Sequence, residues 1–348
     1  MQPLKYLKTL HDSYQLKALN MHLVCSKLHV QKRNNKLTII RQTSFRFISL
    51  THQKLVNSQP NKSTIMSKST EELKSLTTQI RRDILRMVHA VNSGHPGGSL
   101  GCTEYFTALY GKVMNYKLPF TMEGKNEDLF FLSNGHISPV FYSTLARFDF
   151  FPVAELATFR KLGTRLQGHP TTHDHLPGIR VASGSLGQGL SVAIGAALGK
   201  KLNGDTSLVY TLQGDGELQE GQNWEAFMYA AAKKVDNLIA TIDYNGRQID
   251  GDTDDVLDLG DLHAKMEAFG WTVLNEKNGN DLEAVIAILE RAKTETGKGK
   301  PVCILLHTEM GHGVDFMMGT HAWHGKAPSN EQLDNAFKQL YLEAPADY

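Results

Sequence analysis

Apolar positions recur along the chain with two periods, and their alternation predicts alternating strands and helices. Short runs rich in Leu, Ile and Val predict strands at 128–133, 207–212, 238–242, 272–274 and 302–307. Longer stretches with apolar residues at helical spacing predict helices at 69–92, 100–114, 139–148, 154–162, 222–234, 261–269, 281–294 and 329–342. The glycine-rich segment 183–189 is expected to open a further helix, rich in small residues, that runs through 202. This order predicts a doubly wound, mostly parallel α/β sheet with helices on both faces.

Polar residues follow both strands of the central strand–helix–strand unit. Gly214, Asp215 and Gly216 follow the first strand, and Asn245 follows the second. Ligands of such units bind outside the carboxyl ends of the strands. Glycines let the backbone approach a ligand, and carboxylate and amide oxygens suit Mg²⁺ or Ca²⁺ better than zinc. Because Mg²⁺ completes its shell with phosphate oxygens, this pattern predicts a metal-bridged diphosphate.

The segments GDGELQEG and DYNGRQIDG together resemble the thiamine diphosphate fingerprint of the transketolase family. The resemblance implies that Asp215, the Asn245 side chain and the backbone carbonyl of Arg247 ligate Mg²⁺, with Ca²⁺ or Mn²⁺ as substitutes. Family members often carry an aliphatic residue in place of Arg247, but a carbonyl ligand makes no demand on the side chain. From the residues alone, GDG also fits an ordinary glycine-rich turn whose aspartate caps a helix.

Four histidines each match a transketolase motif: His95 in SGHPGG, His136 in SNGH, His169 in QGHP and His324 in WHGKAP. The resemblance implies that His95 and His324 contact the reacting carbonyl or the acceptor aldehyde. It places His169 at the donor hydroxyls and His136 near the diphosphate. Imidazole suits this work because it donates or accepts protons near neutrality. Taken singly, each histidine fits a structural role as well.

The segment GSLGQG resembles the GPLGQG segment of transketolases, with Ser185 where many members have proline. The resemblance puts the backbone near Gly184 and Leu186 against the aminopyrimidine ring of the cofactor, with Ile249 on its other side. Read without the family, the segment is a tight turn before a helix. A helix N-terminus that follows glycines is also a favourable position for an anion.

Two acidic residues, Glu220 and Glu225, follow the metal-binding aspartate on the same turn and helix. In the transketolase family, acidic residues at these positions link the paired active sites across the dimer. As bare sequence, they fit equally well as acidic residues near a helix N-terminus, where the helix dipole favours negative charge.

The net charge of +1 hides an uneven distribution. Residues 1–65 hold 11 Lys or Arg and one acidic residue, Asp12, whereas residues 66–348 hold 26 basic and 35 acidic residues. A negative body excludes nucleic acid as the expected partner, and no apolar run is long enough to span a membrane. The three cysteines have no metal-ligand spacing and predict buried or incidental thiols in a reducing compartment, the cytoplasm.

Residues 1–65 have the composition of a basic leader that is disordered or absent from the mature protein. Met66 and the capping box formed by Ser69 and Glu72 look like a natural start of translation, so a misplaced start competes with an import signal. The remaining residues, 66–348, are expected to form one thiamine diphosphate-binding domain.

The resemblance covers nearly all of 66–348, which is about half of an undivided transketolase. It implies the amino-terminal subunit of a split transketolase of the pentose phosphate pathway, transferring two-carbon ketol units between sugar phosphates. A separate carboxy-terminal subunit would supply the pyrimidine-binding domain with its catalytic glutamate, in a heterotetramer of two plus two. The alternatives are a branched-pentose phosphate transketolase, dihydroxyacetone synthase or deoxyxylulose phosphate synthase type of subunit, or a non-catalytic cofactor-binding subunit.

Overall fold

The computed structural model describes residues 30–33, 36–39 and 68–348. The chain divides into two units, Met1–Lys62 and Ser63–Tyr348. In the first unit, β1 (Val30–Arg33) and β2 (Lys36–Ile39) pair as an antiparallel hairpin. The rest of the leader predicted at 1–65 lies outside the described residues.

A five-stranded sheet forms the centre of the second unit. Its strands are β3 (Leu129–Leu132), β4 (Val209–Gly214), β5 (Leu238–Asp243), β8 (Thr272–Glu276) and β9 (Val302–Leu306). They pair in the order β3-β4-β5-β9-β8, and every neighbouring pair is parallel. The predicted parallel α/β sheet is confirmed, and the carboxyl ends of all five strands lie at the same end of the sheet.

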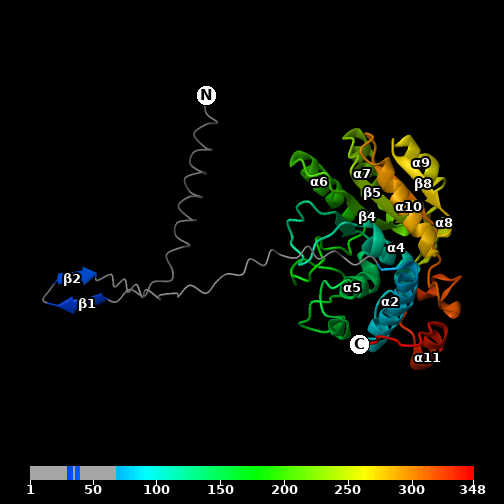
Figure 1. The fold of residues 1–348 in the computed structure, drawn as a ribbon, viewed down its shortest axis with the longest axis horizontal. Helices are drawn as coiled ribbons and strands as arrows, with labels where there is room; N and C mark the ends of the chain where they lie inside the picture. Colours follow the sequence, from blue (N-terminus) through cyan, green and yellow to red (C-terminus); the bar gives the residue numbers. More distant parts are fainter. Residues whose placement is uncertain (1–29, 34–35, 40–67) are drawn as a thin grey trace. The chain divides into compact units, whose positions relative to one another are not determined.

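Helices cover both faces of this sheet (Figure 1). One face packs against α6 (Gly189–Leu202), α7 (Gly221–Ala232) and α9 (Leu262–Ala268). The other packs against α2 (Thr70–Ala90), α4 (Thr103–Ala108), α5 (Ser138–Arg147) and α10 (Leu282–Glu295). Successive strand residues alternate between the two cores, as Phe130 and Phe131 do, because side chains of a strand point to opposite faces.

The first long helix, α2, is fixed at its start and along its length. Ser69 and Glu72 form the predicted capping box at its N-terminus. Its buried Asp83 accepts hydrogen bonds from Arg147 on α5, and its Arg82 pairs with Asp347 near the chain's end. The C-terminus therefore lies beside α2 (Figure 1), after α11 (Asn330–Gln339), which begins at a second capping box.

Some predicted elements differ from the structure. The single helix predicted at 100–114 is three pieces: α3 (Pro96–Gly101), α4 and a π-helical turn, Leu109–Val113. The break follows Gly101, where an added Cβ would lie 2.9 Å from a loop carbonyl, that of Glu309. The helix predicted at 154–162 is a 3₁₀ helix, Val153–Thr158.

A short hairpin and a helix after β5 were not predicted. Strands β6 (Arg247–Gln248) and β7 (Gly251–Asp252) pair antiparallel and lead into α8 (Thr253–Leu257). Strands of two residues are too short to show the alternation of apolar and polar residues from which a strand is predicted. Within the described residues, Cys102 and Cys303 are free and buried, and no helix is long and apolar enough to cross a membrane.

Candidate functional site

A cavity of about 230 Å³ lies at the carboxyl ends of β4 and β5. Most of the residues singled out in the sequence line it: His95, His136, Gly184, Leu186, Gly214, Asp215, Gly216, Asn245, Arg247, Ile249 and His324. They come from six separate segments of the chain. The predicted strand-end site and the histidine loops therefore form one cavity.

Three histidine rings form a cluster on the cavity wall. The ring centroids of His95 and His136 lie 5.2 Å apart, those of His95 and His324 5.6 Å, and those of His136 and His324 5.0 Å. The buried Nδ1 atoms of His95 and His324 have no hydrogen-bond partner within the described part of the chain. Both residues line the cavity, and each has one buried ring nitrogen that no described residue satisfies.

Burial keeps these imidazoles neutral. It is the main reason that the pKa of His95 falls to about 4, and electrostatic repulsion from a protonated His324 and from Arg160 would oppose a second positive charge there. Burial likewise lowers the pKa of His136 and of His324 below the ordinary value. At neutral pH each ring therefore keeps one nitrogen that accepts and one that donates a hydrogen bond.

The strand-end residues Asp215 and Asn245 are joined through the turn after β5. The Asp215 carboxylate accepts hydrogen bonds from the backbone N–H groups of Gly216, at 2.7 Å, and Gly246, at 2.5 Å. The Asn245 amide donates to Asp243, at 2.9 Å, and its oxygen accepts from the Arg247 N–H, also at 2.9 Å. Both side chains are thereby oriented before any ligand binds.

The charge at this turn fits a bound cation. Asp215 is 1% exposed, and burial together with the neighbouring Asp243 raises its pKa to about 8. Within the described ranges, neither carboxylate pairs with a lysine or arginine. A divalent ion would offset this excess of negative charge.

The donor set also fits the ion. The Arg247 guanidinium is cationic and pairs with Asp252, so it cannot ligate a metal ion. The backbone carbonyl of Arg247 is therefore the candidate ligand from this residue. Across the described residues no group of three or more His, Cys, Asp or Glu side chains has a metal-binding arrangement. A shell built from one carboxylate, one amide and one carbonyl suits Mg²⁺ better than zinc.

The GSLGQG segment forms another wall of the cavity, and two of its glycines are required by the backbone. Gly184 has φ +134°, and an added Cβ would lie 2.9 Å from the ring of His169. Gly187 has φ +81° and lies against the Gln222 side chain, which donates a hydrogen bond to the Leu186 carbonyl at 2.8 Å. Ile249 is 57% exposed at the cavity's rim.

Three predicted site residues do not line the cavity. The ring of His169 lies 6.2 Å from that of His95, at the rim, and partial burial lowers its pKa. Glu220 and Glu225 are exposed, at the N-cap and in the second turn of α7. The structure gives them no contact with the histidine cluster.

Five further lining residues were not singled out as site residues in the sequence: Gly98, Asn134, Glu217, Asp243 and Gln248. Asp243 could have been found, because it ends β5 just as the glycine–aspartate turn ends β4. Asn134 precedes the histidine of the SNGH motif, and its buried Oδ1 has no partner in the part of the chain described. Glu217 gave no signal, because a glutamate after a turn is ordinarily exposed.

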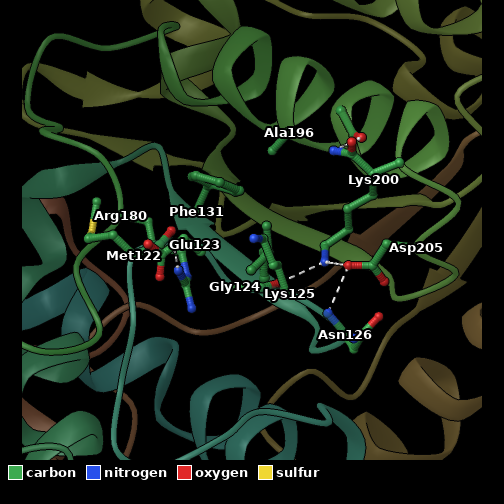
Figure 2. Close-up of a pocket in the computed structure, with 13 residues that line it drawn as sticks. Met122, Glu123, Gly124, Lys125, Asn126, Phe131, Arg180, Ala196, Lys200 and Asp205 are labelled. Carbon is green, nitrogen blue, oxygen red and sulfur yellow. Dashed lines mark hydrogen bonds and ion pairs between the residues drawn. The ribbon is translucent and has the colours of Figure 1, made fainter.

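A larger cavity, of about 630 Å³, lies at the opposite edge of the sheet (Figure 2). The cationic groups of Lys200 and Arg180 in its wall are already paired. Lys200 donates to the Gly124 carbonyl at 3.0 Å and pairs with Asp205 at 2.8 Å, and Arg180 pairs with Glu127 at 2.9 Å. The smaller cavity is therefore the better candidate site, because only it combines unpartnered imidazole atoms with buried, unpaired carboxylates.

The chain matches the family model described as "Transketolase, thiamine diphosphate binding domain" over residues 73–347. The chain belongs to the transketolase family. Residues 73–347 form the thiamine diphosphate-binding domain of that family. As a subunit of a transketolase, the chain is part of a transferase.

Relatives of about the same length are named as transketolase subunits. One, from the apulose-4-phosphate transketolase of Actinobacillus succinogenes, is 37% identical over 273 residues, covering 78% of this chain and 97% of the relative. The 6-deoxy-6-sulfo-D-fructose transketolase subunit SqwG of a Clostridium species is also 37% identical, covering 80% of this chain and 99% of the relative.

Undivided transketolases are nearly twice as long as this chain. The human enzyme is 33% identical over 78% of this chain, which spans 42% of the enzyme. Among solved structures, a Pichia stipitis transketolase variant in complex with fructose 6-phosphate aligns with a TM-score of 0.72 and 33% identity. The alignment covers 78% of this chain and 41% of that one. The chain thus spans less than half the length of these transketolases.

Proposed function

We propose that this chain is the cofactor-binding half of a two-chain transketolase, which transfers two-carbon ketol units from a ketose phosphate to an aldose phosphate. The observation that carries the proposal is the joining of the histidine cluster and the Asp215–Asn245 turn in one cavity. The former suits proton transfer at a carbonyl, and the latter suits a metal-bound diphosphate. The functional unit is residues 66–348.

Asp215, Asn245 and the Arg247 carbonyl would hold Mg²⁺, with Ca²⁺ or Mn²⁺ as substitutes. The ion would bridge to the diphosphate, since Mg²⁺ keeps several positions for phosphate oxygens and water. His136 would lie beside the diphosphate, and Gly184, Leu186 and Ile249 against the aminopyrimidine. The buried, unpaired carboxylate of Asp215 supports this arrangement, because a cation removes its unfavourable charge.

When bound, thiamine diphosphate would supply a nucleophilic carbon for chemistry at the ketose carbonyl. The chain's own groups bind and orient. His95 and His324, which line the cavity, would contact the reacting carbonyl or the acceptor aldehyde, and their lowered pKa values keep them neutral, so that each ring retains a nitrogen that accepts a hydrogen bond. His169, at the rim, would contact the donor hydroxyls.

We propose that a separate carboxy-terminal subunit with a pyrimidine-binding domain completes the site, in an assembly of two plus two chains. Two relatives of matching length are named as single subunits of apulose-4-phosphate transketolases, and this chain spans 42% of the human enzyme. Exposed apolar side chains support a covered surface: Ile249 at the cavity rim and, on α7 beside Glu225, Met228 and Tyr229. Glu220 and Glu225 would then face the paired site across the assembly.

The substrate proposal stays at the class of sugar phosphates. Relatives with the same identity, 37%, are named for different sugars, so similarity selects no single one. A role in the pentose phosphate pathway and a cytoplasmic location belong to the same proposal. The buried free thiols of Cys102 and Cys303 support a reducing compartment.

Calorimetry tests the site directly. Thiamine diphosphate with Mg²⁺ is titrated into the wild-type chain, into Asp215→Ala and into Asp205→Asn, a carboxylate at the opposite edge of the sheet. We expect Asp215→Ala to lose most of the affinity and Asp205→Asn to keep it. If Asp215→Ala binds the diphosphate as tightly as the wild type, the metal assignment is wrong.

A further inference from the structure

The carboxylate of Glu217 joins three segments that surround the cavity. Its Oε1 accepts hydrogen bonds from the Ser133 hydroxyl and from the Gly187 N–H, the latter at 2.7 Å. Its Oε2 accepts from the Gly214 N–H at 3.1 Å. Glu217 is only 2% exposed, so these three donors replace the water that its carboxylate would otherwise bind.

The Glu217 carboxylate also interacts with the N-terminus of α6, through the Ser133 hydroxyl. The Ser133 hydroxyl that donates to Glu217 accepts the Gly189 N–H, at 3.0 Å, and Gly189 is the first residue of α6. The anion favoured by this helix N-terminus is therefore the chain's own glutamate, coupled through a hydroxyl.

The two glycines that Glu217 holds lie in different parts of the site. Gly214 ends β4 in the turn before Asp215, and Gly187 lies in the GSLGQG segment, where its φ of +81° leaves the backbone few partners. Gln222, five residues after Glu217, adds a second link to the same segment through the Leu186 carbonyl. Glu217 accepts three hydrogen bonds from three segments, whereas Gln222 donates one to this segment, so Glu217 is the more extensive link.

We propose that Glu217 is a positioning residue that fixes the GSLGQG segment against the glycine–aspartate turn before the cofactor binds. It sets the spacing between the backbone that contacts the aminopyrimidine and the turn that holds the metal and diphosphate. This inference rests on the proposed function for the identity of the ligand. The rigidity of the segment in the ligand-free chain does not depend on it.

Backbone hydrogen exchange of the full ligand-free chain tests the rigidity. Glu217→Gln keeps the size but loses the charge, and its amide group turns an N–H donor toward an N–H donor. We expect the amides of 187–189 and of Gly214 to exchange about ten-fold faster, the effect of one lost hydrogen bond to a charged group. Unchanged exchange at these amides would overturn the inference.

A matched variant separates positioning from general stability. Asp83→Asn removes a buried carboxylate that pairs with Arg147 and Ser143, far from the cavity. We expect it to lower the melting temperature while leaving the exchange of 187–189 unchanged. If it speeds that exchange as much as Glu217→Gln, the effect is general destabilisation and the inference fails.

Calorimetry with thiamine diphosphate and Mg²⁺ measures the consequence for binding. We expect Glu217→Gln to weaken binding about ten-fold, and Ser133→Ala, a milder change, to weaken it less. If Asp215→Ala loses binding while Glu217→Gln and Ser133→Ala do not, the inference fails and the proposed function stands. If the wild type binds no cofactor either alone or with its partner chain, the proposed function fails, and exchange alone decides the rigidity.

Discussion

The imidazole rings of His136 and His324 lie 5.0 Å apart, although one follows β3 and the other lies in the loop before α11. His95, before α3, completes the cluster. His136 and His324 follow β3 and β9, whose carboxyl ends lie at the same end of the parallel sheet, whereas His95 comes from the turn between α2 and α3. The sheet's direction thus accounts for two of the three rings, and mutations in the cluster test how the site works.

Replacing His95 with glutamine should flatten the dependence of stability on acid. Burial lowers the pKa of His95 from its ordinary value near 6.5 to about 4 in the folded chain. Between pH 6.5 and pH 4, His95 is therefore protonated in the unfolded chain but stays neutral in the folded chain. The wild type therefore loses free energy of unfolding as the pH falls from 6.5 to 4, by about 1 kcal/mol per pH unit from this residue once its partial exposure is allowed for.

Urea unfolding of the wild type and of His95→Gln at several pH values measures this difference. The difference between the two slopes matters, because carboxylates also titrate in this range and are common to both proteins. Equal slopes would contradict a buried, neutral His95. The same variant should reduce turnover of the assembled enzyme at pH 7.5 by more than it changes cofactor affinity.

Gly184→Ala should damage the site, whereas Gly195→Ala should stabilise the chain. At Gly184 the φ of +134° and the nearby His169 ring both oppose a Cβ, so we expect a loss of about 1–2 kcal/mol together with weaker cofactor binding. Gly195, inside α6, has open space around a Cβ, and alanine there should add about 0.5–1 kcal/mol. Thermal unfolding of the two variants gives the signs.

Glu220→Gln and Glu225→Gln should leave cofactor binding by the isolated chain unchanged. Both side chains are exposed and neither lines the cavity. If they act across the assembly, turnover should fall only once the partner is bound, so calorimetry of the chain and kinetics of the complex must disagree. Weaker binding of the cofactor by the isolated Glu220→Gln chain would contradict this placement.

Much of this site follows from local sequence. The glycine–aspartate turn and Asn245 follow apolar runs, and parallel strands bring both to one edge, where the structure has them. Asp243, at the end of β5, obeys the same rule. The Ser69 capping box was readable because it involves residues three positions apart. The histidine cluster needed the family resemblance, because no local pattern says which loops meet.

Glu217 shows what local sequence does not contain. Its three donors belong to a turn after β3, a loop before α6 and the end of β4, and they meet only when α6 docks on the sheet. Periodicity predicts which side of α6 is apolar but not which loop lies beside its first turn. The hairpin at Arg247–Asp252 was not predicted for a different reason, because its two-residue strands are too short to show alternating apolar and polar residues.

The central claim is that this chain holds half of an active site. The direct test measures ketol transfer by the purified chain with thiamine diphosphate and Mg²⁺, alone and with increasing amounts of the chain that carries the pyrimidine-binding domain, sought in the neighbouring reading frame. We predict negligible turnover alone and a rise that saturates at equal amounts of the two chains. Robust turnover by this chain alone would contradict the claim.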